Sequence, residues 1–332
     1  MLRLPGAWLW DFWLAEDGDR YHLFFLFASR ALGDERRRHH RATIGHAVSD
    51  DLRSWVQVGD VVAASEPPAF DDLATWTGSV VRGGDRWWLF YTGVTLVGDR
   101  IRQSIGAATS TDLETWRKEP ASPLVTADER WYERLGGGEW PEEAWRDPWV
   151  LPDPGGDGWH MLITARTNTG PDDDRGVIGH AHSPDLRRWE VLPPLSKPGS
   201  GFGHIECTQI AAVGGRQVLL FSCLDPQLSA ARRATGATGG ILYVPTDSPT
   251  GPFDIAAARP LTDDAFYCGR LVHDRDGQPV LLAFHYYDEA RQFLGELSDP
   301  MPVGWERDEL MVAGAAGAGV GQEDRWHPGD TS

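Results

Sequence analysis

The phrase Ser49-Asp50-Asp51-Leu52-Arg53-Ser54-Trp55 is repeated along the chain. Two more intact copies lie at residues 110–116 (Ser-Thr-Asp-Leu-Glu-Thr-Trp) and 183–189 (Ser-Pro-Asp-Leu-Arg-Arg-Trp). Degenerate copies follow at residues 246–253 and 298–305. Each intact copy comes directly after a short strand-like stretch, at residues 44–48, 105–109 and 178–182. A phrase that recurs in one local context indicates an internal repeat, and this repeat decides the fold.

Two further strand-like stretches precede each copy. The nearer stretch is strongly apolar and lies at residues 21–27, 86–93, 158–166, 217–223 and 279–286. The farther stretch lies at residues 8–15, 76–82, 145–151, 205–213 and 266–273. Gly or Asp turns such as Asp17-Gly18-Asp19 separate the two, as hairpins require. The repeated unit is therefore a four-stranded antiparallel sheet.

Five such units predict an all-β fold, a five-bladed β-propeller of four-stranded antiparallel blades. The alternative is a β-sandwich with accidental repeats. We expect the propeller to be one catalytic domain at residues 1–312, without a C-terminal β-sandwich. Residues 313–332 are rich in Gly and Ala, and we expect a disordered tail. The best candidate for a helix is residues 127–135.

Composition narrows the class of protein. The 332 residues include 49 acidic and 31 basic ones, a net charge of −18, which argues against nucleic acid or an anionic membrane as partner. The 16 tryptophans suit carbohydrate binding, because indole faces stack on sugar rings. Three cysteines fit a reduced compartment, and the N-terminus does not resemble a signal peptide, so we expect a cytoplasmic protein. The oligomeric state stays open.

Three carboxylates fall at one level of the innermost strands. Asp11, Asp147 and Glu206 precede the second strand of their blades by 10, 12 and 11 residues. Thr77 and Tyr267 hold the matching places in the other two blades. Because first strands line the channel of a propeller, we expect the three acids around one axial pocket. They would repel one another, so at least one should have a raised pKa. One carboxylate that attacks and one acid that protonates is the arrangement of glycoside hydrolysis.

At these residues the chain resembles glycoside hydrolase family 32, the family of invertases, levanases and inulinases, and the related families 68 and 43. The matching motifs are Asp11, Trp76-Thr77-Gly78-Ser79, Arg146-Asp147-Pro148, Glu206-Cys207 and Phe266-Tyr267. The first motif departs from family 32: Trp10-Asp11-Phe12-Trp13 is closer to the Trp-Asp-x-Trp of family 68. Ala265 stands where family 32 has the Asp of its Asp-Phe-Tyr motif.

The resemblance implies a retaining hydrolase of β-fructofuranosides such as sucrose, sucrose phosphate or fructan. Asp11 would be the nucleophile, Glu206 the acid/base, and Asp147 the residue that binds ring hydroxyls and stabilises the transition state. Arg146 would position Asp147. The predicted substrate-binding residues are Trp10, Trp13, Trp76, Thr77, Ser79, Arg146, Cys207 and Tyr267. Neither a cofactor nor a metal is predicted, and the partner is a small or oligomeric sugar.

Other interpretations stay open. They are a fructosyltransferase, a family 43-like inverting arabinofuranosidase or xylosidase, and a non-catalytic glycan-binding propeller. The basic run at residues 36–41 falls in a loop on the expected active-site face. It is either a solvated loop or an attraction for a phosphorylated sugar. Asp172-Asp173-Asp174 occupies the equivalent loop of the third blade, but it lacks the ligand spacing of a calcium site.

Overall fold

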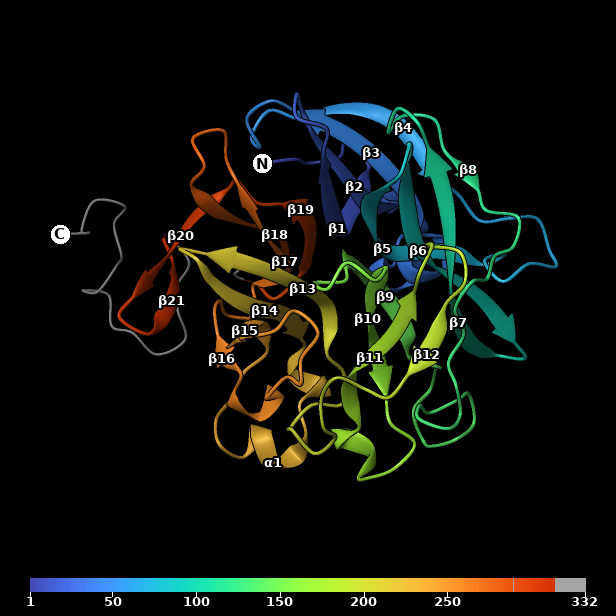
Figure 1. The fold of residues 1–332 in the computed structure, drawn as a ribbon, viewed down its shortest axis with the longest axis vertical. Coiled ribbons are helices and arrows are strands. Elements are labelled where there is room, and N and C mark those ends of the chain that lie inside the picture. The colour runs from blue at the N-terminus through green and yellow to red at the C-terminus, as the bar shows by residue number, and fades with distance from the viewer. Residues whose placement is uncertain (289, 314–332) are drawn as a thin grey trace.

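A computed structural model describes residues 1–288 and 290–313 of the chain. Its strands form five antiparallel sheets arranged around a centre (Figure 1). Blade 1 contains β1 (Ala7–Glu16), β2 (Tyr21–Ser29), β3 (Thr43–Ser49) and β4 (Val56–Val62). Blade 2 contains β5 (Ala74–Gly83), β6 (Arg86–Val97), β7 (Arg100–Ser110) and β8 (Arg117–Lys118). Blade 3 contains β9 (Trp145–Pro152), β10 (Trp159–Arg166), β11 (Gly176–Ser183) and β12 (Glu190–Leu192).

The last two blades complete the ring. Blade 4 contains β13 (Glu206–Val213), β14 (Arg216–Cys223), β15 (Gly240–Pro245) and β16 (Arg259–Pro260). Blade 5 contains β17 (Phe266–His273), β18 (Pro279–Tyr287), β19 (Phe293–Leu297), β20 (Met301–Glu306) and β21 (Glu309–Val312). In blades 1 to 4, strands that follow one another in the chain are hydrogen-bonded neighbours. The prediction of a five-bladed propeller is confirmed. Blade 5 has a fifth strand, because β19 and β20 pair with different parts of β18.

The helical content is small. The described part of the chain has one four-residue α-helix, α1 (Ala230–Arg233), and none of its helices is long and apolar enough to cross a membrane. Short 3₁₀ turns are η1 (Arg30–Leu32), η2 (Glu35–Arg41), η3 (Asp172–Asp174), η4 (Asp225–Gln227) and η5 (Ile255–Ala257). The predicted helix at residues 127–135 is wrong. Arg166 and Thr167 anchor this segment to β10: Glu133 donates its N–H to the Arg166 carbonyl, and Tyr132 bridges to Thr167.

The repeated phrase forms the turn between the third and fourth strands of blades 1, 2 and 3. Asp51 shows its role: Oδ1 accepts the N–H groups of Arg53 (2.8 Å) and Ser54 (2.7 Å). The leucine of the phrase has a positive φ, 61° at Leu52. The tryptophan packs on the preceding blade, since Trp116 of blade 2 meets Phe24 of blade 1 edge to face at 5.6 Å. The phrase is therefore a structural turn that also joins blades.

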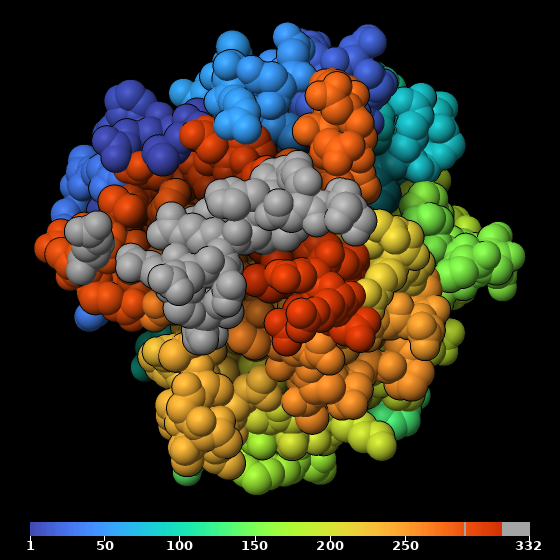
Figure 2. All heavy atoms as spheres, turned by 90° about the vertical axis from the view of Figure 1, so that its left-hand side faces the viewer, coloured from blue at the N-terminus to red at the C-terminus, as the bar shows by residue number. Residues whose placement is uncertain are grey.

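The ring is closed by the N-terminal residues. The first strands contact one another around the centre, and β1 contacts both β5 and β17. Leu2 pairs with Leu297 of β19, and Arg3 forms an ion pair with Glu296. Figure 2 shows the blue N-terminal residues beside the red residues of blade 5. The start of the chain is thus held by the last blade. Most of the predicted tail, residues 314–332, lies outside the described residues.

Candidate active site

Every innermost strand contains a β-bulge at the same level. The register against the second strand shifts between Trp10 and Phe12 in β1, between Trp76 and Gly78 in β5, and at the corresponding places in β9, β13 and β17. A bulge adds one residue and redirects the side chains next to it. In blades 3, 4 and 5 the bulge contains a residue with positive φ: Asp147 (55°), Cys207 (53°) and Cys268 (50°). Five bulges therefore turn side chains toward the propeller axis.

The strand pairing corrects the alignment that residue spacing predicted. Glu206 pairs with Ser222 as Arg146 pairs with Thr164. Glu206 is therefore the structural equivalent of Arg146, and Cys207 is the equivalent of Asp147. Tyr267 likewise precedes the positive-φ residue of its blade. Counting residues back from the second strand gave positions one residue off for Glu206 and Tyr267, because the loops that join the first two strands differ in length among blades 3, 4 and 5.

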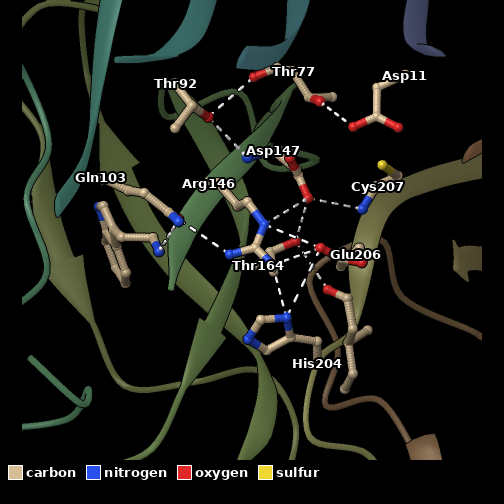
Figure 3. Close-up of polar contacts among 12 residues, drawn as sticks. Asp11, Thr77, Thr92, Gln103, Arg146, Asp147, Thr164, His204, Glu206 and Cys207 are labelled. Carbon is tan, nitrogen blue, oxygen red and sulfur yellow. Dashed lines mark hydrogen bonds and ion pairs between the residues drawn. The ribbon is translucent and has the colours of Figure 1, made fainter. Parts of the chain in front are cut away.

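The three predicted acids do lie around one cavity. It has a volume of about 310 Å³. Its lining residues are Trp10, Asp11, Leu26, Arg36, His39, His40, Trp76, Thr77, Ile101, Glu142, Arg146, Asp147, Glu206 and Gln227. Figure 3 shows Asp147 between Asp11 and Glu206 in this view, each from a different blade. Blades 1, 3 and 4 thus bring together carboxylates that are far apart in the sequence.

Asp11 is partly open to this cavity and has few partners. The Thr77 hydroxyl donates a hydrogen bond to its Oδ2 at 2.7 Å (Figure 3). Burial, followed by the charge of Asp147, raises the pKa of Asp11 from 3.8 to about 7. The hydrogen bond from Thr77 opposes this shift. The expectation that at least one of the three acids has a raised pKa is confirmed.

This shift predicts a pH-dependent effect on stability. The folded-state pKa of Asp11 exceeds the unfolded value, so its contribution to stability is lost as pH rises toward about 7. Asp11→Asn removes this loss and keeps an acceptor for Thr77. We expect the free energy of unfolding of the variant, relative to that of wild type, to increase by about 1–3 kcal/mol from pH 5 to pH 8. The lower end of this range applies if water around the partly exposed Asp11 weakens the effect. Urea unfolding at both pH values measures it, and a gap that stays constant with pH would contradict the prediction.

Asp147 is held more firmly. Its Oδ2 accepts hydrogen bonds from the Thr164 hydroxyl (2.9 Å) and the Cys207 N–H (3.2 Å). Its own N–H donates to Thr92 Oγ1 at 3.1 Å. Burial raises the pKa of Asp147, and the charge of Arg146 opposes the rise. Two hydrogen bonds hold the carboxylate and a third holds the backbone of Asp147, so this residue suits a positioning or charge-stabilising role more than one that requires movement.

Glu206 is paired with a buried arginine. Arg146 donates to its Oε1 from Nε (3.1 Å) and Nη2 (2.5 Å), and Tyr267 donates its hydroxyl to Oε2. The same guanidinium contacts Asp147 at 3.8 Å. Arg146 therefore links the two carboxylates and offsets their charge. Glu206 still lines the cavity.

Four of the predicted substrate-binding residues are not among those that line the cavity. Trp13 is fully buried and stacks on Phe24 in the core, so the prediction of a sugar contact is wrong for this residue. Ser79 is buried and accepts the N–H of Val150, which joins blades 2 and 3. Cys207 is buried and holds Asp147 through its backbone. Tyr267 acts on the site through Glu206. The other predicted residues, Trp10, Trp76, Thr77 and Arg146, line the cavity.

Sequence reasoning missed the polar lining residues Glu142 and Gln227, and it gave His39 only as a member of the basic run at residues 36–41. Glu142 is bonded to Arg146 Nη1 at 3.0 Å, and its pKa is raised by burial. Gln227 enters from the segment before α1. His39 lies between the rings of Trp10 and Trp76, about 6 Å from each. Of the two missed residues, only Glu142 carried a signal in the sequence, its place four residues before Arg146.

The two charged runs have different surroundings. The basic run forms η2, and its Arg36, His39 and His40 line the cavity, as a loop on the active-site face should. The acidic run forms η3 and is held by protein groups. Asp172 pairs with Arg166 and Arg175, while Asp174 accepts the N–H groups of Gly201 and Phe202. These contacts tie the acidic run to neighbouring protein groups.

Comparison with known proteins adds the family. The sequence profile described as "Glycosyl hydrolases family 32 N-terminal domain" matches residues 14–293. This chain belongs to glycosyl hydrolase family 32. The match begins after Asp11, so the place of Asp11 in the family 32 site rests on its position in blade 1.

Two relatives show how far the family 32 similarity extends. An extracellular sucrase from Zymomonas mobilis is 26% identical over 88% of this chain and 78% of its own length. A sucrose-6-phosphate hydrolase from Pediococcus pentosaceus is 26% identical over 53% of this chain. That match spans about a third of the Pediococcus protein, 32% of its length.

Two solved structures have a similar fold. The inulosucrase from Halalkalicoccus jeotgali, bound to kestose, superposes with a TM-score of 0.74 at 22% identity. The superposition covers 94% of this chain and 88% of the inulosucrase. Fructan 1-exohydrolase IIa from Cichorium intybus gives 0.68 at 21% identity, covering 94% of this chain and 59% of that one.

Proposed function

We propose that this protein is a glycosidase that hydrolyses β-fructofuranosides with retention of configuration. The observation that carries the proposal is the cavity that Asp11, Asp147 and Glu206 share, with Arg146 between the last two. Retaining glycosidases need a nucleophile and an acid/base on the two sides of the scissile bond. Membership of family 32 supports fructosides as the substrate class.

Each carboxylate has a role in this mechanism. The carboxylate of Asp11 attacks the anomeric carbon of the fructosyl unit. The bond between that carbon and the leaving oxygen breaks, and the carboxyl of Glu206 donates a proton to the leaving oxygen. Glu206 then takes a proton from water, and the water oxygen displaces Asp11. Asp147 binds ring hydroxyls and stabilises the positive charge of the transition state. Tyr267 and Arg146 hold the carboxyl of Glu206 toward the cavity.

The experiment is a substrate screen followed by stereochemistry. Sucrose, sucrose 6-phosphate, inulin, levan and aryl arabinosides are tested for release of reducing sugar. Proton NMR of the first product then reads the anomer. We expect fructose release with retention. Inversion, or activity on arabinosides alone, would contradict the proposal, and longer fructans in place of free fructose would identify a transferase.

A phosphorylated fructoside is a second candidate substrate, and a specific observation favours it. Arg36, His39 and His40 line the cavity, and the relatives include sucrose-6-phosphate hydrolases. A guanidinium forms strong, paired hydrogen bonds with phosphate. The cytoplasmic location that would supply such a sugar stays a prediction, and the Zymomonas relative is described as extracellular.

Arg36→Gln tests the phosphate site. We expect the KM for sucrose 6-phosphate to rise about 10-fold, because one charged hydrogen-bond donor is lost. The KM for sucrose should change less than about 2-fold. Arg37→Gln is the matched control: Arg37 belongs to η2 but is not among the residues that line the cavity. Equal changes in KM for both substrates would mean that Arg36 determines the conformation of the loop and does not bind the phosphate.

A further inference from the structure

A cluster of imidazoles and one carboxylate lies in blade 3, at the end of β9 that is away from Asp147. Asp153 follows β9 in the turn to β10, and His160 and His182 face each other across β10 and β11. One potential ligand atom from each of the three lies within 4.8 Å of the other two. Nothing in the proposed hydrolysis uses these residues.

Each side chain of the cluster is fixed in place. Asp153 Oδ1 accepts the N–H of Gly155 at 2.6 Å, and Oδ2 contacts His160 Nε2 at 2.6 Å. The carbonyl of Asp157 contacts Nε2 of His182 at 2.7 Å. On its other side, His160 Nδ1 contacts His180 Nε2 at 2.9 Å. A second partner of this kind orients the imidazole ligands of metal ions in proteins.

Blade 1 contains the same Asp–His–His series of contacts as blade 3, with one difference. Asp17, His22 and His46 correspond to Asp153, His160 and His180, with contacts of 3.1 Å and 3.0 Å. His22 pairs with Val48 across the strands, where His160 pairs with His182. Blades 1 and 3 therefore share the Asp–His–His chain, and the extra imidazole in blade 3 is not needed to build it.

We propose that Asp153, His160 and His182 bind a divalent ion of the zinc class. Two imidazoles and one carboxylate are the ligand set of many zinc sites, with a fourth position for water. Calcium is a poor match, because it takes six to eight oxygen ligands. The ion would replace the proton that His160 and Asp153 share. The ion would then join the β9–β10 turn to β11 and stabilise blade 3 at a distance from the active-site cavity.

The test is zinc titration of tag-free, chelator-treated protein by calorimetry at neutral pH. Wild type is expected to bind one equivalent. His182→Val, which copies blade 1, is expected to bind at least 10-fold more weakly and to keep wild-type hydrolase activity without metal. Zinc should raise the melting temperature of wild type by a few degrees and leave that of His182→Val unchanged. Asp17→Asn in blade 1 is the matched control, and its zinc affinity should equal that of wild type.

Cobalt separates this site from the other cluster of potential ligands, Asp11, Cys207 and Cys268. Cobalt at Asp153, His160 and His182 should give visible absorption bands without an intense thiolate charge-transfer band. Three results would overturn the proposal. They are no zinc binding at micromolar concentration, equal binding by His182→Val, or binding that carries a thiolate band and inhibits hydrolysis.

Discussion

Asp11→Ala is expected to abolish turnover, by a factor of about 10⁴ or more, on any fructoside. The reason is the covalent step. Without the Asp11 carboxylate no fructosyl-enzyme can form, and the leaving group does not change this. The loss should therefore be equally deep for sucrose and for a substrate with a fluoride or aryl leaving group. Initial rates on both substrates, with fructose measured directly, give the result.

Thr77→Val is the matched control for the loss at Asp11. It removes the hydrogen bond to Oδ2 at 2.7 Å and keeps the carboxylate. A loss of about 10-fold is expected, because one hydrogen bond to a charged group disappears. If Asp11→Ala keeps more than about a hundredth of wild-type activity on either substrate, another group is the nucleophile. Melting curves of both variants exclude unfolding as the cause.

The propeller could be predicted from the sequence because its repeat is local. Asp51 binds the N–H groups of its own turn, and Trp116 packs on Phe24 of the preceding blade, so each blade needs the same few residues. The helix predicted at residues 127–135 failed for the opposite reason. This segment crosses between blades, where contacts with β10 outweigh its local helical pattern.

The site could be predicted only in part, because bulges break the alternation of side chains along a strand. In a regular strand Trp13 would share a face with Asp11. The extra residue of the β1 bulge reverses the alternation after Asp11, and Trp13 enters the core. Gln227 comes from an irregular segment, whose course no periodicity predicts. The acids themselves were found because they fall at similar levels of the inner strands, and a carboxylate among apolar residues there is unusual.

Glu206→Ala is expected to separate the two halves of catalysis. On sucrose, whose leaving oxygen needs a proton, the loss should be about 10²–10⁴-fold. On a fluoride or activated aryl fructoside, the fructosyl-enzyme forms without an acid, so the rate of this first step should be largely kept. Loss of the base then slows only the second step, the attack of water. Added azide should restore part of the turnover, because a small anion can enter the vacated space and attack the fructosyl-enzyme. Product analysis should then show fructosyl azide.

The surroundings of Glu206 provide the controls for this experiment. Tyr267→Phe removes the hydroxyl that donates to Oε2 but keeps the acid, so it should lose about 10-fold on sucrose and gain nothing from azide. Glu206→Gln keeps an acceptor for Arg146, so it tests whether the loss in Glu206→Ala comes from a displaced guanidinium. If Glu206 acts as acid and base, Gln and Ala should be impaired alike on sucrose, since neither can give a proton. Equal losses on poor and good leaving groups, without azide rescue, would instead assign Glu206 to binding or to an inverting mechanism.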